Sequence, residues 1–242
     1  MLVKKKLKPR MNKKLVEAVL IIDRSGSMSS IKTETINGIN EFIESQKNLG
    51  LECRITIAQF DNEYDLLADY QDVQTVEPIN ESIYIPRGMT ALNDAIGKTI
   101  TSLQARLKTT KKKDKPSKTV IAIITDGQEN ASTEYTGPKI KALIEELETK
   151  EKWTFLYIAA NQDAVKEAHT RGISANNTLS FVSNGPQGTM GSQGAFRAMN
   201  NYVNTVYTSG NASFSAEDRA AAMGQSSSTG VGVATEDTSS LA

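Results

Sequence analysis

The sequence predicts an α/β fold: a doubly wound, mostly parallel sheet with helices on both faces and one antiparallel edge strand. Short apolar runs typical of strands alternate with longer segments in which apolar residues recur every three or four positions. Three of the strand runs are almost continuously apolar, as expected for parallel strands buried on both faces. Such alternation produces a sheet covered by helices on each side. With 242 residues, the chain is long enough to bury one sizeable core.

The strands can be placed from these apolar runs. A short run at 64–68 follows the turn sequence Asp61-Asn62-Glu63, so we expect it to return as an antiparallel edge strand. We expect the other strands at 15–22, 53–60, 119–125, 153–160 and 178–183.

Four segments show helical periodicity, with an apolar stripe on one face of each. Pro138 suits the first turn of the third segment. We interpret every stripe as a surface that packs on the sheet. The four stripes begin at Ile36, Leu92, Ile140 and Phe196.

The chain divides into three zones. Residues 1–13 form a basic arm without any acidic residue, and residues 14–208 carry the periodic pattern of one domain. Residues 209–242 are small and polar. Because such a tail buries little apolar area, we expect it to be disordered on its own.

The composition argues against several functional classes. The 28 basic residues are balanced by 28 acidic ones, so a globally basic nucleic-acid-binding protein is not indicated. Cys53 is the only cysteine, which excludes a disulfide within the chain and suits a reducing compartment. No run approaches the roughly 18 apolar residues of a membrane span, and the N-terminus lacks a signal-peptide pattern. We expect a soluble cytoplasmic protein that makes no membrane contact.

Three oxygen-bearing side chains follow the first strand directly. Asp23, Ser25 and Ser27 come after the apolar run 15–22, and no cysteine or histidine lies near them. Carboxylate and hydroxyl oxygens are ligands for hard divalent cations, which keep several waters and do not need a cage made of protein alone. The turn therefore predicts a metal site with open coordination positions.

Two further loops can contribute to the same site. Asp126 follows the strand 119–125, which is the neighbour of the first strand in a doubly wound sheet. Binding sites in such sheets form at the carboxyl ends of the strands where the strand order reverses. We therefore expect Asp23 and Asp126 to face one another. Thr90, in the loop before the helix at 91–107, can act as a third oxygen ligand or as a helix cap.

The combination of Asp23-x-Ser25-x-Ser27, Gly88-Met89-Thr90 and Thr125-Asp126-Gly127 resembles the metal-ion-dependent adhesion site (MIDAS) of von Willebrand factor A domains. The resemblance covers about residues 14–208 and is closest to stand-alone intracellular members from bacteria and their phages. It implies a location in the cytoplasm of a bacterium or an infected cell, or in a phage particle.

The resemblance also implies a role for each residue of the motif. Ser25 and Ser27 would bind the ion directly, and Thr90 directly or through water. Asp23 and Asp126 would be the anionic members, each direct or bridged by water. Arg24 would point away. The ion would be Mg²⁺, Mn²⁺ or Ca²⁺, since all three accept these oxygens.

Three functions are consistent with such a site. In the first, a partner protein presents an Asp or Glu carboxylate that completes the coordination of the ion. In the second, the ion is a structural brace and the chain is a component of a larger assembly. In the third, the ion activates water to hydrolyse a phosphoester. We expect no enzyme, because no general base accompanies the site and no Gly-x-Gly-x-x-Gly or Walker sequence is present.

Four single residues and one glycine-rich segment receive structural interpretations. We interpret His169 and Cys53 as a surface residue and a strand residue, and Asp61 and Asp94 as surface or capping residues. The glycines between 185 and 194 suit a flexible loop better than an anion cradle.

A lysine-rich segment between the second helix and the third long strand lies at the end of the sheet opposite the predicted metal site. We interpret it as a solvated loop, with an acidic partner or nucleic acid as the alternative. Its members are Lys108, Lys111, Lys112, Lys113, Lys115 and Lys118.

Overall fold

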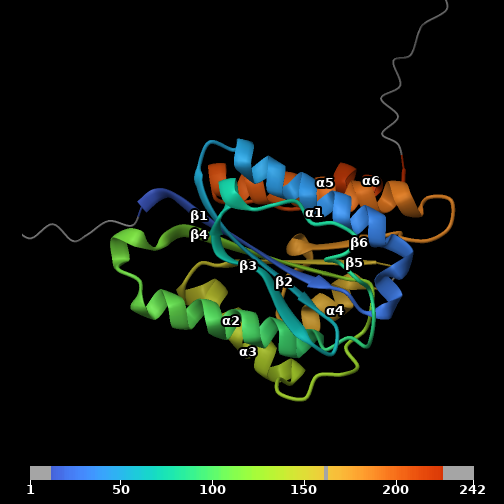
Figure 1. Cartoon of the computed structure of the whole chain (residues 1–242), viewed down its shortest axis with the longest axis horizontal. Helices are drawn as coiled ribbons and strands as arrows, with labels where there is room; N and C mark the ends of the chain where they lie inside the picture. Colours follow the sequence, from blue (N-terminus) through green and yellow to red (C-terminus); the bar gives the residue numbers. More distant parts are fainter. Residues whose placement is uncertain (1–11, 161–162, 226–242) are drawn as a thin grey trace, which may run out of the picture.

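A computed structural model describes residues 12–160 and 163–225 of the chain (Figure 1). Its strands are β1 (Asn12–Asp23), β2 (Glu52–Phe60), β3 (Tyr64–Asp72), β4 (Pro116–Thr125), β5 (Thr154–Ala160) and β6 (Thr178–Phe181). Its α-helices are α1 (Lys32–Asn48), α2 (Leu92–Thr109), α3 (Gly137–Lys150), α4 (Ala164–Thr170), α5 (Gly188–Ser209) and α6 (Ala216–Ala222). Short 3₁₀ helices are η1 (Gly26–Ile31), η2 (Val73–Thr75), η3 (Lys112–Asp114) and η4 (Ala175–Asn177).

The six strands form one sheet in the order β3-β2-β1-β4-β5-β6. Only the β2–β3 pair is antiparallel, and the other four pairs are parallel. The predicted fold class is therefore confirmed. The strand order reverses between β1 and β4, which are hydrogen-bonded neighbours with Ile22 opposite Ile124. The crevice between their carboxyl ends is where such folds place their sites.

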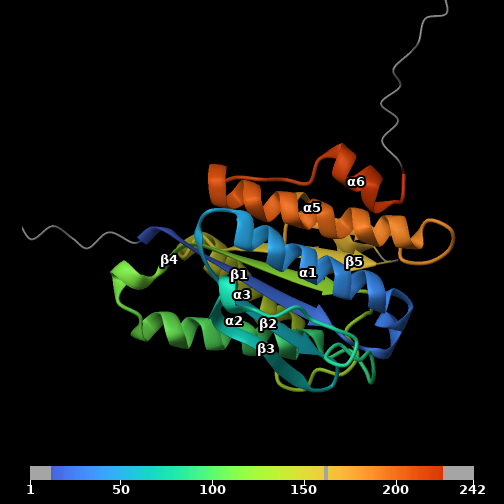
Figure 2. The ribbon, with the colours of Figure 1, turned by 45° about the horizontal axis from the view of Figure 1, so that its top comes forward.

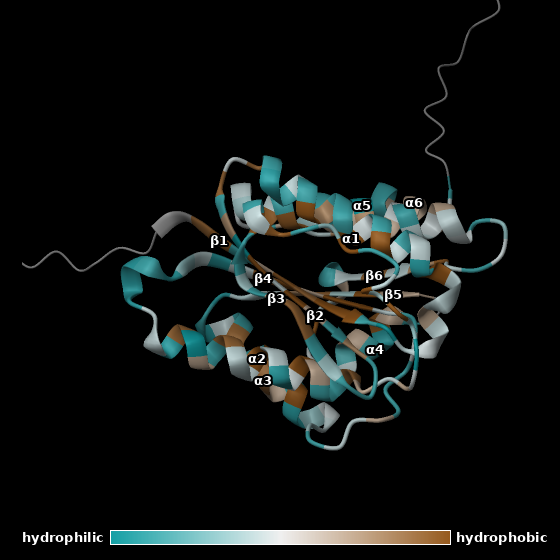
Figure 3. Cartoon of the chain, viewed as in Figure 1, coloured by the Kyte–Doolittle hydropathy of each residue, from teal (hydrophilic) through white to brown (hydrophobic). Residues whose placement is uncertain are grey.

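Helices cover both faces of the sheet. α1, α5 and α6 lie on one face and α2, α3 and α4 on the other (Figure 1), and Figure 2 shows α1, α5 and α6 side by side on the first face. Apolar residues concentrate on the strands and on the helix surfaces that meet them (Figure 3). Along β1, Leu20 and Ile22 pack on the α1 side while Val19 and Ile21 pack on the α2 side, so the central strand is buried on both faces.

Part of the polar tail predicted from residue 209 is folded in the structure. Residues 210–225 fold back along α5, and Phe214 and Ala222 join the core. The Val182 N–H donates to the Ala222 carbonyl at 3.0 Å, which ties α6 to the end of β6. Ser215 and Asp218 form a capping box that begins α6. This helix is rich in alanine and lacks an apolar stripe, so its sequence resembles a polar tail. Residues 226–242 lie outside the described residues.

The glycines after residue 185 belong mainly to α5, so the prediction of a flexible loop is wrong for them. A Cβ at Gly191 would lie 2.3 Å from the Val182 carbonyl oxygen, and one at Gly194 would lie 2.3 Å from that of Ala221. The missing side chains let α6 and the end of β6 approach the α5 backbone closely. These glycines serve helix packing, and they do not form an anion cradle.

The boundary between the predicted basic arm and the domain lies slightly earlier in the structure than in the prediction. β1 begins at Asn12, whose backbone pairs with Pro116 of β4, so the last residues of the predicted arm belong to the strand. Residues 1–11 of the arm lie outside the described residues. Within the part of the chain that the structure describes, no helix is both long enough and apolar enough to cross a membrane.

Candidate metal centre

The ends of β1 and β4 hold the two acidic residues of the predicted site. Asp23 is the last residue of β1, and Asp126 follows Thr125, the last residue of β4. The Thr125 hydroxyl donates to Asp23 Oδ2 at 2.6 Å, and the Ser25 backbone N–H donates to Asp23 Oδ1 at 2.6 Å. The Asp23 carboxylate is thus oriented by both strands before any ion is considered.

Two serine hydroxyls link the acidic residues. Ser25 Oγ lies 3.0 Å from Ser27 Oγ, and the Ser27 hydroxyl donates to Asp126 Oδ1 at 2.6 Å. The turn after β1 continues into η1, so it presents both hydroxyls on the same side.

Gly127 marks the centre of the cradle. A Cβ at this position would lie 3.0 Å from Thr90 Oγ1, 3.5 Å from Ser27 Oγ and 3.7 Å from Asp23 Oδ2. Oxygens from the turn after β1 and from the Thr90 loop therefore surround one small volume beside the loop after β4, and the absence of a side chain at Gly127 keeps that volume open. The structure brings together all five residues that the sequence predicted: Asp23, Ser25, Ser27, Thr90 and Asp126.

The Thr90 loop is fixed from two directions. The Thr90 N–H donates to Asn130 Oδ1 at 2.9 Å, and the Asn130 N–H donates to the Thr90 carbonyl at 3.1 Å. On the other side, the Gly26 N–H donates to the Gly88 carbonyl at 3.2 Å, which joins the loop to η1. Thr90 is therefore held between the two loops that carry the acidic residues.

Tyr84 contacts the end of β1 from the core of the domain. Its ring is fully buried, and its hydroxyl donates to the Asp23 carbonyl at 2.6 Å. Sequence reasoning gave no role to Tyr84, Thr125, Gly127 or Asn130, although Thr125 and Gly127 flank Asp126 in the motif that carries the resemblance. Thr125 could have been found, because it directly precedes Asp126 at the end of an apolar strand. The other three act through contacts between loops, for which local sequence gives no signal.

Arg24 points away from the cradle and into a cluster of charges. It is buried, with its guanidinium 3.2 Å from Asp61 and 2.7 Å from Asp65. Asp61 also accepts from Arg87 at 2.9 Å. Asp61 is buried, so it is not the surface residue that one interpretation made it, but it does cap the turn after β2 by accepting the Glu63 N–H at 2.6 Å. The same carboxylate also joins the Asp23 turn to the Thr90 loop through two arginines.

Asp94 holds the loop that follows β4. Its carboxylate, nearly buried in the first turn of α2, accepts the backbone N–H groups of Thr133, Glu134 and Tyr135 at 2.8–3.0 Å. Burial raises the pKa of this carboxyl, but the three N–H donors outweigh burial, and the pKa is lower than usual. Asp94 is thus neither a surface residue nor a cap of its own helix. It orders the segment that contains Asp126 and Asn130.

Helix capping does not account for the cluster. η1 begins after Ser25 and α2 after Ala91, and in neither helix does the side chain of the N-cap residue accept a hydrogen bond. The residue before α3 is Thr136, ten positions beyond Asp126. The hydroxyls and carboxylates are therefore available for another purpose.

Burial raises the pKa values of both acidic residues of the cradle. Desolvation, with a smaller contribution from nearby Asp126, raises the pKa of Asp23 to about 6, against the lowering effect of its bonds from Thr125 and Ser25. Burial also raises the pKa of Asp126, against its bond from Ser27. Asp23 is fully buried and Asp126 is partly buried, and two such neighbouring carboxylates are stabilised in their charged forms by a cation.

The donor set fits a hard divalent ion. Among the described residues, no group of three or more His, Cys, Asp or Glu side chains is arranged to hold a metal. The cradle instead offers two carboxylates and three hydroxyls around the space beside Gly127. Oxygen donors of this kind, with room left for water or another ligand, suit Mg²⁺ and Mn²⁺.

A comparison with protein families agrees with this geometry. The sequence profile of the von Willebrand factor type A domain matches residues 17–192. The chain belongs to the von Willebrand factor type A (VWA) family. A comparison with curated proteins gave no significant match.

Several solved structures share the fold at low sequence identity. The first is a von Willebrand factor type A protein from Catenulispora acidiphila, with 15% identity, a TM-score of 0.52 and coverage of 80% of this chain and 42% of that one. The manganese-loaded TRAP protein of Plasmodium vivax has 16% identity, a TM-score of 0.50 and coverage of 70% and 69%. Proximal thread matrix protein 1 of the mussel byssus, with a zinc-occupied MIDAS motif, has 16% identity, a TM-score of 0.51 and coverage of 79% and 46%. The chain thus spans less than half of two of these proteins.

The imidazole of His169 and the thiol of Cys53 lie outside the cradle. His169 is exposed near the end of α4, as predicted. Cys53 is buried at the start of β2, and burial raises the pKa of its thiol to about 12.

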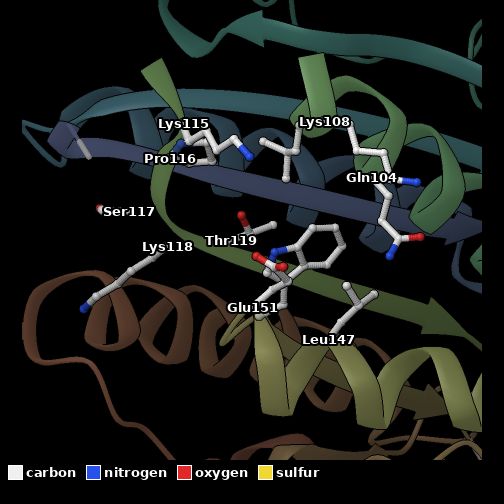
Figure 4. A pocket seen from close by; sticks show the side chains of 11 residues that line it. Gln104, Lys108, Lys115, Pro116, Ser117, Lys118, Thr119, Leu147 and Glu151 are labelled. Atoms are coloured by element: carbon white, nitrogen blue, oxygen red, sulfur yellow. The ribbon is translucent and has the colours of Figure 1, made fainter. Parts of the chain in front are cut away.

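A basic pocket of about 160 Å³ lies at the other end of the sheet, where β4 and β5 begin (Figure 4). Lys108, Lys115 and Trp153 contribute to its lining. Lys118 lies within β4 and turns toward α5, where its ammonium donates to the last carbonyls of the helix, at Val206 and Tyr207. Lys118 is therefore not part of the solvated loop predicted for it, whereas Lys111, Lys112 and Lys113 are exposed as expected.

Proposed function

We propose that this VWA domain is a divalent-metal-dependent protein-binding module, and that a carboxylate of the partner protein completes the coordination of the ion. The observation that supports the proposal is the cradle around Gly127, which contains three side-chain hydroxyls and only two carboxylates. Mg²⁺ or Mn²⁺ would be held by Ser25, Ser27 and Thr90, with Asp23 and Asp126 binding directly or through water.

The charge balance favours an external acid. Hydroxyl ligands carry no charge, so they leave a bound divalent cation strongly electrophilic. The Asp23 carboxylate is also engaged by Thr125 and Ser25, which limits its share of the ion. A partner Asp or Glu then gains a charge-assisted contact in a partly desolvated site, where such contacts are stronger than in water.

Hydrolysis is less consistent with the site. A metal-dependent phosphoester hydrolase needs a group that accepts a proton from water. The two acidic residues of the cradle are occupied by hydrogen bonds from Ser27, Thr125 and Ser25. We therefore propose a binding module and not an enzyme.

A structural brace is the second candidate, and one observation favours it. The cradle joins the loops after β1 and β4 and the loop before α2, so an ion in it would tie three segments of the fold together. In that case the ion would stabilise the domain without any external acid. Copies of the chain would then be building units of a larger assembly.

An affinity experiment separates the two candidates. The full chain is used to capture proteins from a lysate of its source, in Mg²⁺, in EDTA, and as the Asp23→Ala variant in Mg²⁺. The proposal predicts a partner retained only by the wild type in Mg²⁺, and substitution of one Asp or Glu in that partner should release it. A partner retained under all three conditions would contradict the proposal and favour the brace.

A further inference from the structure

One loop beside the cradle exposes several apolar side chains. Among the described residues, six large hydrophobic side chains are exposed, and three of them lie within residues 83–89. Ile83, Ile85 and Met89 are 39%, 51% and 56% exposed. The others, Leu66, Val165 and Met190, lie on three different elements. Concentrated apolar exposure on a soluble domain marks an interaction site more often than chance placement does.

The backbone of this loop holds the side chains outward. Tyr84 is fully buried on one side of Ile85, and Pro86 on the other side restricts Ile85 to an extended conformation. Gly88 has φ of +67°, and a Cβ there would lie 2.2 Å from Asn62 Oδ1. The loop is packed at the buried positions and cannot turn Ile85 inward without losing those contacts.

Hydrogen bonds attach the same loop to the turn after β1. The Arg87 N–H donates to the Arg24 carbonyl at 2.7 Å, and the Gly26 N–H donates to the Gly88 carbonyl at 3.2 Å. Met89 directly precedes Thr90, whose hydroxyl lines the cradle. Met89 therefore adjoins the cradle in the chain, and Ile85 lies two residues before Arg87, where the loop is bonded to the turn after β1. Both exposed side chains belong to a loop that is fixed against this turn.

We propose that Ile85 and Met89 form an apolar rim that selects carboxylate ligands with an apolar side chain next to the acid. The inference rests on the proposed function, because the acid is taken to bind the ion. A ligand carboxylate in the cradle brings its neighbouring side chains against this rim. Methionine adapts to ligands of different shapes, and partial burial of one leucine side chain corresponds to about tenfold in affinity.

Four capped peptides test the rim. They are acetyl-Gly-Leu-Glu-Leu-Gly-amide, acetyl-Gly-Ser-Glu-Ser-Gly-amide, and the same two peptides with Gln in place of Glu. Dissociation constants are measured by NMR titration of the ¹⁵N-labelled full chain, in excess Mg²⁺ and in EDTA. We expect the leucine-flanked Glu peptide to bind about tenfold more tightly than the serine-flanked one, and only in Mg²⁺.

Surface variants assign the preference to the loop. The double variant Ile85→Ser/Met89→Ser should bind the two Glu peptides equally. Met190→Ser is the matched control, because it removes a methionine of similar exposure, 50%, on α5. This control should keep the tenfold preference.

The outcomes distinguish this inference from the function on which it rests. Equal affinity of the wild type for both Glu peptides, or a preference that persists in the double variant, would overturn the rim and leave metal-dependent acid binding intact. If neither Glu peptide binds in Mg²⁺ more tightly than its Gln counterpart, the proposed function fails, and the rim fails with it.

Discussion

At the scale of single residues, the site depends on the missing side chain at Gly127 as well as on its carboxylates and hydroxyls. The carboxylates and hydroxyls define the chemistry, but the position of Gly127 keeps the space between them free. A side chain at this position would compete with an ion for the same volume. Gly127 has no backbone conformation that demands glycine, so its role can be tested separately from folding.

Gly127→Ala should weaken divalent-metal binding at least about tenfold with little change in stability. The added methyl group would lie beside Thr90 Oγ1, Ser27 Oγ and Asp23 Oδ2. Calorimetric titration with Mn²⁺ measures the affinity, and urea unfolding in EDTA measures the stability. Gly137→Ala is the control, since nothing lies within 4 Å of a Cβ there. Unchanged Mn²⁺ affinity in Gly127→Ala would place the ion elsewhere.

The polar members of the cluster could be predicted from the sequence, and their supports could not. Asp23, Ser25, Ser27 and Asp126 follow apolar strands directly, so chain order alone shows that they gather at one edge of the sheet. Tyr84 is distant from Asp23 in sequence, and nothing in its surroundings indicates that its hydroxyl meets the Asp23 carbonyl.

At the scale of elements, the loops around the site are stabilised by buried acids at helix and strand ends. Asp94 is the clearest case, because one side chain on α2 satisfies three consecutive N–H groups of the loop after β4. The same loop carries Asp126. The stability of this loop and the metal affinity of the cradle should therefore change together.

Asp94→Ala should lower the free energy of unfolding by about 2–3 kcal/mol, since hydrogen bonds to a charged group are the stronger ones and three N–H groups lose their acceptor. Mn²⁺ affinity should fall as well. Asp94→Asn keeps one oxygen acceptor and should lie between alanine and wild type. Glu134→Gln, which breaks only the exposed pair with Lys98, should change stability by less than about 1 kcal/mol. Urea unfolding of all three variants provides the comparison, and equal stabilities would refute the role of Asp94.

The contact between α5 and α6 makes a second prediction. Gly194→Ala places a methyl group where the Ala221 carbonyl lies, at 2.3 Å, so α6 must move away. We expect faster cleavage by trypsin after Arg219, whose guanidinium otherwise donates to the carbonyls of Thr178 and Ala175. The proteolysis rate, followed by mass spectrometry, should rise relative to wild type and to Gly137→Ala. No change in the rate would show that α6 packs in another way.

Strands and long helices were predictable because their apolar periods are strong, whereas α6 was not. Its seven residues carry no stripe, and its packing relies on glycines in a different helix. The role of Lys118 was hidden for a similar reason: its position in the chain resembles a lysine loop, but its partners are the last carbonyls of α5.

At the scale of the whole molecule, the two ends of the sheet differ in chemistry. The carboxyl ends of the strands carry the oxygen cradle and the exposed apolar loop, and the amino ends carry the lysine-rich segment and the basic pocket. Recognition through the cradle depends on a divalent ion, whereas attraction to the basic end would depend on ionic strength. Binding that needs metal at every salt concentration therefore belongs to the cradle.

The most direct test of the account is Mn²⁺ binding by the wild type and by variants of the cradle, measured by calorimetric titration. We predict one ion per chain for the wild type. Asp23→Asn and Ser27→Ala should bind Mn²⁺ at least about tenfold more weakly. Loss of a residue that only supports a metal ligand already lowers metal affinity by about tenfold or more. Ser29→Ala is the matched control, because the Ser29 hydroxyl donates to the Gly26 carbonyl, at 2.7 Å. Wild-type affinity in Asp23→Asn and Ser27→Ala would contradict the central claim.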